Sequence, residues 1–168
     1  LQIYAMMYSD ADESAYGLKT HSKMVALARA AGLMQSSARI SGKANDLATL
    51  WQQFVEGEER KRTAFAIHQI DTLWYQFLST PRLLSHLEVK HELPCPDEYW
   101  MAISADDWAH KRLVSNQSGT EMQYSEAIRC LLSADQSTNN DITFDPYGAI
   151  NITQFLTSSA REISGWST

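Results

Sequence analysis

The first regular pattern of apolar and polar positions begins near residue 12 and has the spacing of a helix. Leu18, Val25 and Ala28 lie three or seven positions apart, which places them on one face of a helix that Asp12 can cap. Gly32 ends this pattern, because glycine readily adopts the left-handed conformation that closes a helix before an apolar residue packs back onto the last turn.

A longer helical pattern follows Asp46, whose side chain can also cap a helix. Gly57 is a soft point within it, so we expect one helix that reaches this glycine and a second helix over about 58–78. Pro81 ends the second helix, because the residue before a proline is pushed out of the helical conformation. The apolar positions of the two helices are Leu47, Leu50, Trp51, Phe54, Ile67, Ile70, Trp74, Phe77 and Leu78.

The remainder of the chain predicts shorter helices joined by irregular segments. Residues 82–96 read as extended or irregular backbone, since two prolines restrict the chain around Cys95. Asp97 and Ser104 can each cap a short helix. Further helices are expected over 125–132 and 146–163, with polar connections at 35–46 and 133–142. The pattern indicates an all-α fold, an irregular multi-helix array of about six or seven helices.

Length and composition agree with one folded domain over residues 1–168. The chain has 44% hydrophobic and 20% charged residues with only 7 glycines and 4 prolines, which is typical of a globular protein. It carries 14 basic against 20 acidic residues, a net charge of -6, whereas proteins that bind nucleic acid carry basic patches that neutralise phosphates. No apolar run has the length of a membrane span. We therefore expect this segment to bind neither DNA nor a membrane.

The two cysteines indicate reduced thiols in an intracellular protein. Cys95 and Cys130 are too few for a disulfide framework, and neither has the paired Cys and His spacing of a structural zinc site. No cofactor is therefore expected in this chain.

The segment from Trp51 to Trp100 reads WQQFVEGEERKRTAFAIHQIDTLWYQFLSTPRLLSHLEVKHELPCPDEYW. It resembles the middle homology region of fungal-specific transcription factors, the regulatory domain named after xylanolytic activators. The upstream stretch ALARAAGL also resembles this family, so the resemblance covers roughly residues 14–108. The motif positions are Trp51, Glu59, Arg60, Arg62, Asp71, Pro81, Leu93, Pro94, Cys95 and Trp100.

The resemblance implies a nuclear protein that regulates RNA polymerase II transcription. DNA and zinc would be bound by an N-terminal module outside this chain, and the wording ERKRTAFAIHQIDTLWYQFLS is more similar to members with a two-Cys two-His finger. The candidate partners are a small-molecule effector, a protein co-regulator and a second copy of the chain. Because the family domain begins upstream and LQIYAMMYSD looks like a cut helix, the chain is expected to be a fragment, the C-terminal portion of that domain.

Two charged features near the apolar stripe have structural interpretations. Glu58 and Arg62 lie four residues apart in a charged run that could bind a partner, but local pairing on a solvated helix face is the favoured interpretation. Asp71 lies beside the apolar stripe, where an unpartnered carboxylate would be costly. We expect it to accept from backbone amides in the turn at 79–83, or to pair with Arg62 or Arg82, and so to fix the helix exit.

Two sets of titratable residues could carry chemistry. His86 and His91 flank Glu88 ahead of Cys95, so a zinc site is an alternative, but the favoured interpretation is surface histidines and a buried thiol. The second set comprises Asp106, Asp107 and His110, whose residue types suit acid-base catalysis. First-turn carboxylates that complement the helix dipole explain the two aspartates better. No catalytic or metal-ligating residue is therefore predicted.

Large aromatic residues at helical spacing have two interpretations. Core packing is favoured, and a pocket for an effector is the alternative. The residues concerned are Trp51, Trp74, Tyr75, Phe77, Tyr99, Trp100 and Trp108. The sequence thus predicts a regulatory or interaction module that acts by conformational bias, with a small all-α enzyme and a passive helical scaffold as the alternatives.

Overall fold

The computed structural model describes residues 2–7, 11–36, 46–115, 122–133 and 144–164, and within them it is all-α with seven helices and no sheet. This confirms the predicted fold class. The α-helices are α1 (Gln2–Met7), α2 (Ala11–Ala30), α3 (Leu47–Leu78), α4 (Asp97–Trp100), α5 (Ala105–Val114), α6 (Tyr124–Leu132) and α7 (Pro146–Ser164), with a 3-10 turn η1 at His86–Glu88. The predicted connections at 35–46 and 133–142 fall mostly outside the described residues.

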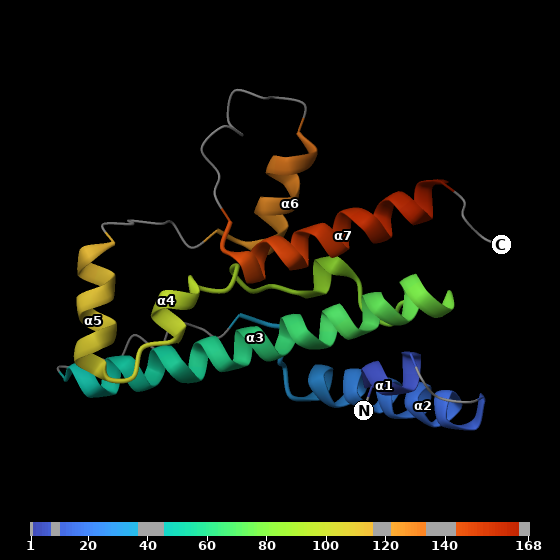
Figure 1. Cartoon of the computed structure of the whole chain (residues 1–168), viewed down its shortest axis with the longest axis horizontal. Helices are drawn as coiled ribbons and strands as arrows, with labels where there is room; N and C mark the ends of the chain where they lie inside the picture. The colour runs from blue at the N-terminus through green and yellow to red at the C-terminus, as the bar shows by residue number, and fades with distance from the viewer. Residues whose placement is uncertain (1, 8–10, 37–45, 116–121, 134–143, 165–168) are drawn as a thin grey trace.

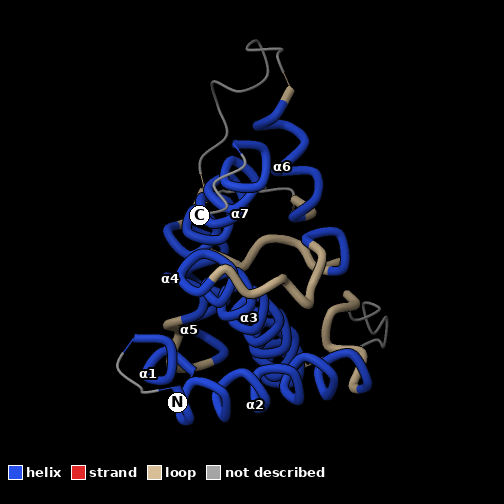
Figure 2. The backbone as a smooth tube through the Cα atoms, turned by 90° about the vertical axis from the view of Figure 1, so that its right-hand side faces the viewer, coloured by secondary structure: helices blue, strands red, loops and turns tan. Residues whose placement is uncertain are grey.

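The long helix α3 is the axis of the molecule. The pair α1 and α2 lies along one side of it, α7 lies along the opposite side, and α5 packs against its N-terminal end (Figure 1). The chain that leaves α3 runs back along it to α4, and the end-on view shows α6 and α7 on the side away from α2 (Figure 2). Because α3 contacts α1 and α2, α5 and α7, its buried side chains cover a wide arc of the helix instead of one narrow stripe.

The core joins four parts of the chain around the middle of α3. Phe65 packs edge-on against Tyr124 with ring centroids 5.1 Å apart, and both side chains are fully buried. Aromatic pairs in this geometry are favourable beyond their area of burial. The buried apolar cluster comprises Val25, Ala28, Met34, Ala64, Phe65, Ile67, Leu84, Val89, Tyr124, Ala127, Ile128 and Ile152.

The end of α2 follows the prediction. Gly32 has a φ of 61°, and its amide donates to the Arg29 carbonyl at 2.9 Å. The next amide, that of Leu33, donates to the Ala28 carbonyl at 2.9 Å. These two bonds form the glycine-terminated cap in which the chain turns left-handed and satisfies the last carbonyls.

The predicted start of α3 is confirmed, but the predicted break within it is wrong. Asp46 accepts from the amides of Ala48 and Thr49 and caps the helix. The helix then runs through Gly57 without interruption to Leu78 and closes at Ser79, which is left-handed with a φ of 53°. An interior glycine costs a helix only about 1 kcal/mol, and the tertiary contacts on both sides of Gly57 outweigh that cost.

The shorter helices show which local caps the sequence predicts correctly. Ser104 caps α5, since its hydroxyl accepts from the Asp107 amide at 3.1 Å. The cap at Asp97 is wrong, because Pro96 precedes α4 and Asp97 is the first helical residue. Asp12 likewise lies in the first turn of α2, which begins one residue earlier.

Helix α1 packs closely on α2 and α3. A Cβ atom on Gly17 would lie 2.6 Å from the Cβ of Ala5, so only glycine permits this approach of α1 to α2. The indole nitrogen of Trp74 on α3 donates to the Gln2 side chain at 3.0 Å. Among the described helices, none combines the length and the apolar character needed to cross a membrane.

Candidate functional site

Glu58 is the centre of a buried charged cluster at the middle of α3. Its carboxylate, whose residue is 2% exposed, lies 3.0 Å from Arg62 Nε and 3.0 Å from Lys61 Nζ, and it accepts from the Cys95 amide at 2.9 Å. The local pairing of Glu58 with Arg62 is confirmed. The expected solvated face is wrong, because the segment before α4 covers this carboxylate.

Arg62 connects α3 to the segment around Cys95, to α4 and to α7. Its guanidinium donates to the Cys95 carbonyl at 3.0 Å and to Asp97 Oδ1 at 3.1 Å. It also lies 5.0 Å from the ring centroids of Trp100 and Tyr147, within the range of a cation–π contact. The cluster therefore joins α3, α4 and α7.

Cys95 is a protected thiol within this cluster. Burial, together with the nearby Glu58 carboxylate, raises the pKa of Cys95 to about 12. A thiol that is protonated at neutral pH is neither a nucleophile nor a metal ligand. The arrangement supports packing rather than chemistry at this position.

Asp71 connects α3 to α2 and to the chain that follows α3. Its carboxylate is 1% exposed and accepts from the amides of Leu83, at 3.0 and 3.1 Å, and Leu84, at 2.8 Å. His21 on α2 completes the set, with 2.9 Å between its Nε2 and Asp71 Oδ1. Burial alone would raise the pKa of Asp71, but the bonds from His21 and the two amides hold it below its ordinary value.

The expectation for Asp71 is confirmed for the backbone amides and wrong for the arginines. Arg62 faces the Glu58 cluster, and Arg82 bonds to His86 and to Ser158 and Glu162 on α7. The sequence analysis missed His21 as a partner. Its spacing could have revealed it, because His21 lies three residues after Leu18 and four before Val25, on the buried face of α2.

The prediction that the histidines lie on the surface is wrong for four of the five. His21, His68, His86 and His91 are all at most 9% exposed. His68 Nε2 lies 2.7 Å from His86 Nδ1, and Arg82 bonds to the other nitrogen of His86. Since arginine can only donate, His86 Nδ1 carries the proton and donates to His68.

This histidine pair is neutral and does not form a metal site. Desolvation by burial lowers the pKa of His68 to about 4 and that of His86 to about 3. Glu88 bonds to Arg29, and His91 bonds to the Leu33 carbonyl, so the candidate zinc ligands point apart. No group of three or more His, Cys, Asp and Glu side chains converges within the described ranges.

The candidate acid-base set lies on the surface of α5. Asp107 accepts from the Ile103 amide at 3.1 Å and from Lys111 Nζ at 2.8 Å, and the bond from Lys111 lowers its pKa. Asp106 and His110 are exposed. The two aspartates occupy the first turn of α5, as the dipole interpretation predicts.

The other motif residues are distributed over the fold. Glu59 and Pro81 are exposed, Trp51 and Leu93 are half-buried, and Pro94 is buried. The ten motif positions thus do not line a common pocket. Three of them, Arg60, Arg62 and Asp71, bond from α3 to neighbouring segments.

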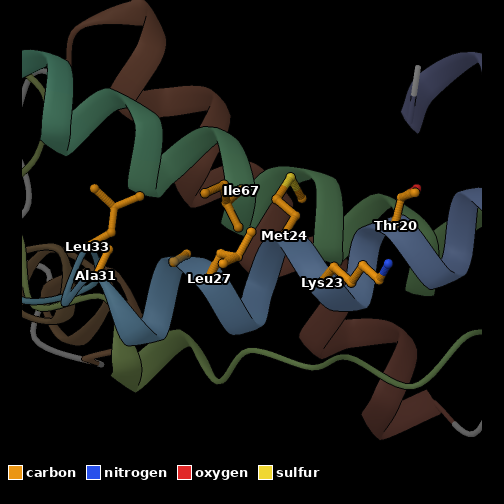
Figure 3. A pocket seen from close by; sticks show the side chains of 8 residues that line it. Thr20, Lys23, Met24, Leu27, Ala31, Leu33 and Ile67 are labelled. Carbon is orange, nitrogen blue, oxygen red and sulfur yellow. The ribbon is translucent and has the colours of Figure 1, made fainter.

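An open apolar groove of about 500 Å³ runs between α2 and α3 (Figure 3). The polar side chains among its described lining residues are Lys23 and Thr20, which lie toward one end, while Ala31 and Leu33 lie toward the other. Leu27, in its middle, is 70% exposed. The lining comprises Thr20, Lys23, Met24, Leu27, Ala28, Ala31, Leu33 and Ile67.

Polar contacts fix the groove at both ends. The bond between His21 and Asp71 joins α2 to α3 near Thr20. At the other end Arg60, a motif residue, donates from α3 to the carbonyls of Ala31, at 3.0 Å, and Gly32, at 2.8 Å. These contacts within the chain set the spacing of α2 and α3 at both ends of the groove.

The seven aromatic candidates do not line this groove, and three of them pack in the interior. Trp74, Tyr99 and Trp108 are buried, which confirms core packing for these three, whereas Phe77 is 59% exposed. None of the seven aromatic candidates is among the lining residues described above. The groove does not correspond to the alternative interpretation, a pocket lined by these aromatic residues, because its lining is mainly aliphatic.

The sequence of the chain is similar to known proteins. A model of the family described as "Fungal specific transcription factor domain" matches residues 1–160. The nicotinate catabolism cluster-specific transcription factor of Emericella nidulans is 31% identical over 64 residues, which is 38% of this chain and 7% of that protein. No solved structure matches the chain.

Proposed function

This chain belongs to the fungal-specific transcription factor domain family, and from that premise we propose that it is a regulatory module whose ligand binds the groove between α2 and α3. Membership makes it a transcription-factor domain rather than an enzyme, and it implies action in the nucleus. The described part of the chain contains no DNA-binding module. Its function is therefore to regulate a factor that contacts DNA elsewhere.

The DNA-binding part belongs, in this proposal, to a zinc-finger module outside the chain. The family usually accompanies a zinc cluster elsewhere in the protein. The net charge of -6 supports this division, because an acidic segment repels the phosphate backbone. The sequence ERKRT favours a two-Cys two-His zinc finger as that module. The whole factor would then control RNA polymerase II transcription. The position of the chain as the C-terminal portion of the regulatory domain stays a prediction.

The apolar groove is the observation that carries the binding proposal. It is open to solvent, and Leu27 in its middle is 70% exposed among the residues that the structure describes. An effector or a protein co-regulator that bridges α2 and α3 would favour the arrangement in which the two helices are joined. Such a ligand can shift the conformation only by its difference in affinity for the two arrangements.

A route from the groove to the rest of the fold passes through Asp71. Its carboxylate bonds both to His21, beside the groove, and to the amides of Leu83 and Leu84, which follow α3. A change in the position of α2 would therefore alter the exit of α3. This is the conformational bias that the regulatory module would use.

A reporter assay tests the proposal. The whole chain, fused to a heterologous DNA-binding domain, is compared with Leu27→Asp in the groove and Leu132→Asp on α6, which is 63% exposed. We expect only Leu27→Asp to change reporter output, because a carboxylate in the groove opposes apolar binding. Equal output from the three proteins would show that the groove is not the regulatory site and would favour the passive scaffold.

A further inference from the structure

We propose that the groove between α2 and α3 binds an acidic amphipathic helix of a partner protein. This inference rests on the proposed function and names the class of ligand. It depends on three properties of the groove, which are its shape, its charge and its exposed apolar side chains.

The shape of the groove suits a helix better than a small molecule. The lining positions on α2 run from Thr20 to Ala31, and eleven steps of 1.5 Å give a length of about 16 Å, or three helical turns. Sites for small molecules enclose most of the ligand surface, whereas this groove is open to solvent. A helix that buries one face and exposes the other fits an open groove of this length.

The charge around the groove selects an acidic partner. From Ser14 to its end α2 carries Lys19, Lys23 and Arg29 and no acidic residue, and Arg29 is already paired with Glu88. Lys23 lies at one end of the groove and forms no ion pair within the part of the chain that the structure describes. Arg60 holds a positive charge at the other end, beside Gly32. Carboxylates on both flanks of a helix would meet these cations.

The apolar side chains supply the contact surface. Leu27 is 70% exposed, and Met24 and Leu33 are partly buried beside it. Methionine is unbranched and adapts to different partners. Leucines at spacings of three and four on a partner helix would cover Leu27 and bury it.

Three fluorescein-labelled peptides of about 16 residues test the chemistry by fluorescence anisotropy against the whole chain. The first is an amphipathic helix with a leucine stripe flanked by glutamates, the second has lysines in place of the glutamates, and the third has alanines in place of the leucines. We expect the acidic peptide to bind, the lysine peptide to bind roughly three- to tenfold more weakly, and the alanine peptide to bind at least about tenfold more weakly. The affinity of the acidic peptide should fall as salt is added.

Variants of the chain locate the binding. Leu27→Asp should reduce affinity for the acidic peptide at least about tenfold, and Lys23→Glu should reverse part of the preference between the acidic and lysine peptides. The matched controls on α6 are Leu132→Asp and Arg129→Glu, which make the same changes at exposed sites remote from the groove. Unchanged melting temperatures would show that every variant is folded.

The possible outcomes distinguish failure of the acidic-helix inference from failure of the proposed regulatory function. Equal binding of the acidic and lysine peptides, or binding that Leu27→Asp leaves intact, would overturn the inference. Loss of dimers in Leu27→Asp by sedimentation, without peptide binding, would overturn it in favour of a second copy. If no peptide binds but Leu27→Asp still changes reporter output, the acidic helix is wrong and the regulatory groove stands. If neither effect is seen, both proposals fail.

Discussion

Removing the Asp71 carboxylate should destabilise the domain more than any exposed charge change. The side chain is buried and accepts from two backbone amides, those of Leu83 and Leu84, and from His21. Asp71→Ala leaves these donors without their partner, and two of them, the Leu84 amide and the His21 imidazole, belong to buried residues. Leu84 is a core residue with 2% exposure, so its amide cannot turn to solvent without disturbing the core.

The magnitude follows from the number of donors left unpaired. An unsatisfied buried donor costs about 1 to 3 kcal/mol, so two amides and one imidazole would cost about 3 to 9 kcal/mol if all three were buried. Because Leu83 is 37% exposed and its amide can bond to water, we expect the lower part of this range, a loss of about 3 to 5 kcal/mol in the free energy of unfolding. For a chain of this length, 1 kcal/mol corresponds to about 2 to 4 °C in melting temperature. Asp71→Ala should therefore lower the melting temperature by roughly 6 to 20 °C.

Thermal unfolding followed by circular dichroism measures this change. Asp106→Ala is the matched control, because it deletes the same group from an exposed position in the first turn of α5 and should cost less than about 1 kcal/mol. Asp71→Asn keeps an acceptor oxygen and should lie between Asp71→Ala and the unmodified chain. A double-mutant cycle with His21→Ala should show coupling between the two side chains.

Two results would refute this reasoning. A melting temperature for Asp71→Ala within 2 °C of the unmodified chain, given the conversion above, would mean that the carboxylate does not fix the exit of α3. Full additivity of Asp71→Ala and His21→Ala would mean that the bond between α2 and α3 contributes nothing.

Further predictions concern a turn, a histidine pair and a thiol. Gly32→Ala should lower the free energy of unfolding by about 1 kcal/mol, because Gly32 has a positive φ. Gly57→Ala should raise the free energy of unfolding by up to about 1 kcal/mol, because a Cβ at this position inside α3 meets nothing within 4 Å. If the two variants shifted the denaturant midpoint in the same direction, this prediction would be wrong. The folded-state pKa values of His68 and His86, about 4 and about 3, lie below the ordinary 6.5, so the unfolded chain binds more protons. The contribution of these two neutral imidazoles to the free energy of unfolding should be fully present above pH 6.5. It should fall by up to about 1.4 kcal/mol per pH unit for each imidazole as the pH drops toward 4. Equal urea midpoints at pH 7 and pH 5 would disprove this prediction. Cys95 should react with iodoacetamide at pH 8 at least about a hundredfold faster in urea than in the folded chain, and similar mass-spectrometric rates would show that it is not protected.

Local features of the sequence predicted several helix boundaries. Asp46 and Ser104 cap their helices because a side-chain oxygen needs only the amides two or three residues ahead. Gly32 closes α2 because the left-handed turn is a property of the glycine itself. These interactions span a few residues, so the order of residues is enough to predict them.

The same local reasoning failed where distant segments compete with it. The break at Gly57 did not occur, because burial of Glu58 under the segment around Cys95 holds the helix together. Asp97 is not a cap, because Arg62, 35 residues earlier, bonds to its carboxylate. Histidine suits both surface and interior, so only the packing of α2 and α7 on α3 decided that four of the five are buried.

The sequence by itself determined the helical class, the caps that depend on neighbouring residues, and the family to which the chain belongs. The tertiary structure decided which polar side chains are buried, that Asp71 bonds to His21, and that an apolar groove with basic ends lies between α2 and α3. The physical reason is the separation along the chain of the residues that interact. A cap or a helical period is set within a few residues, whereas a groove exists only once two helices, each with its own pattern, are placed side by side.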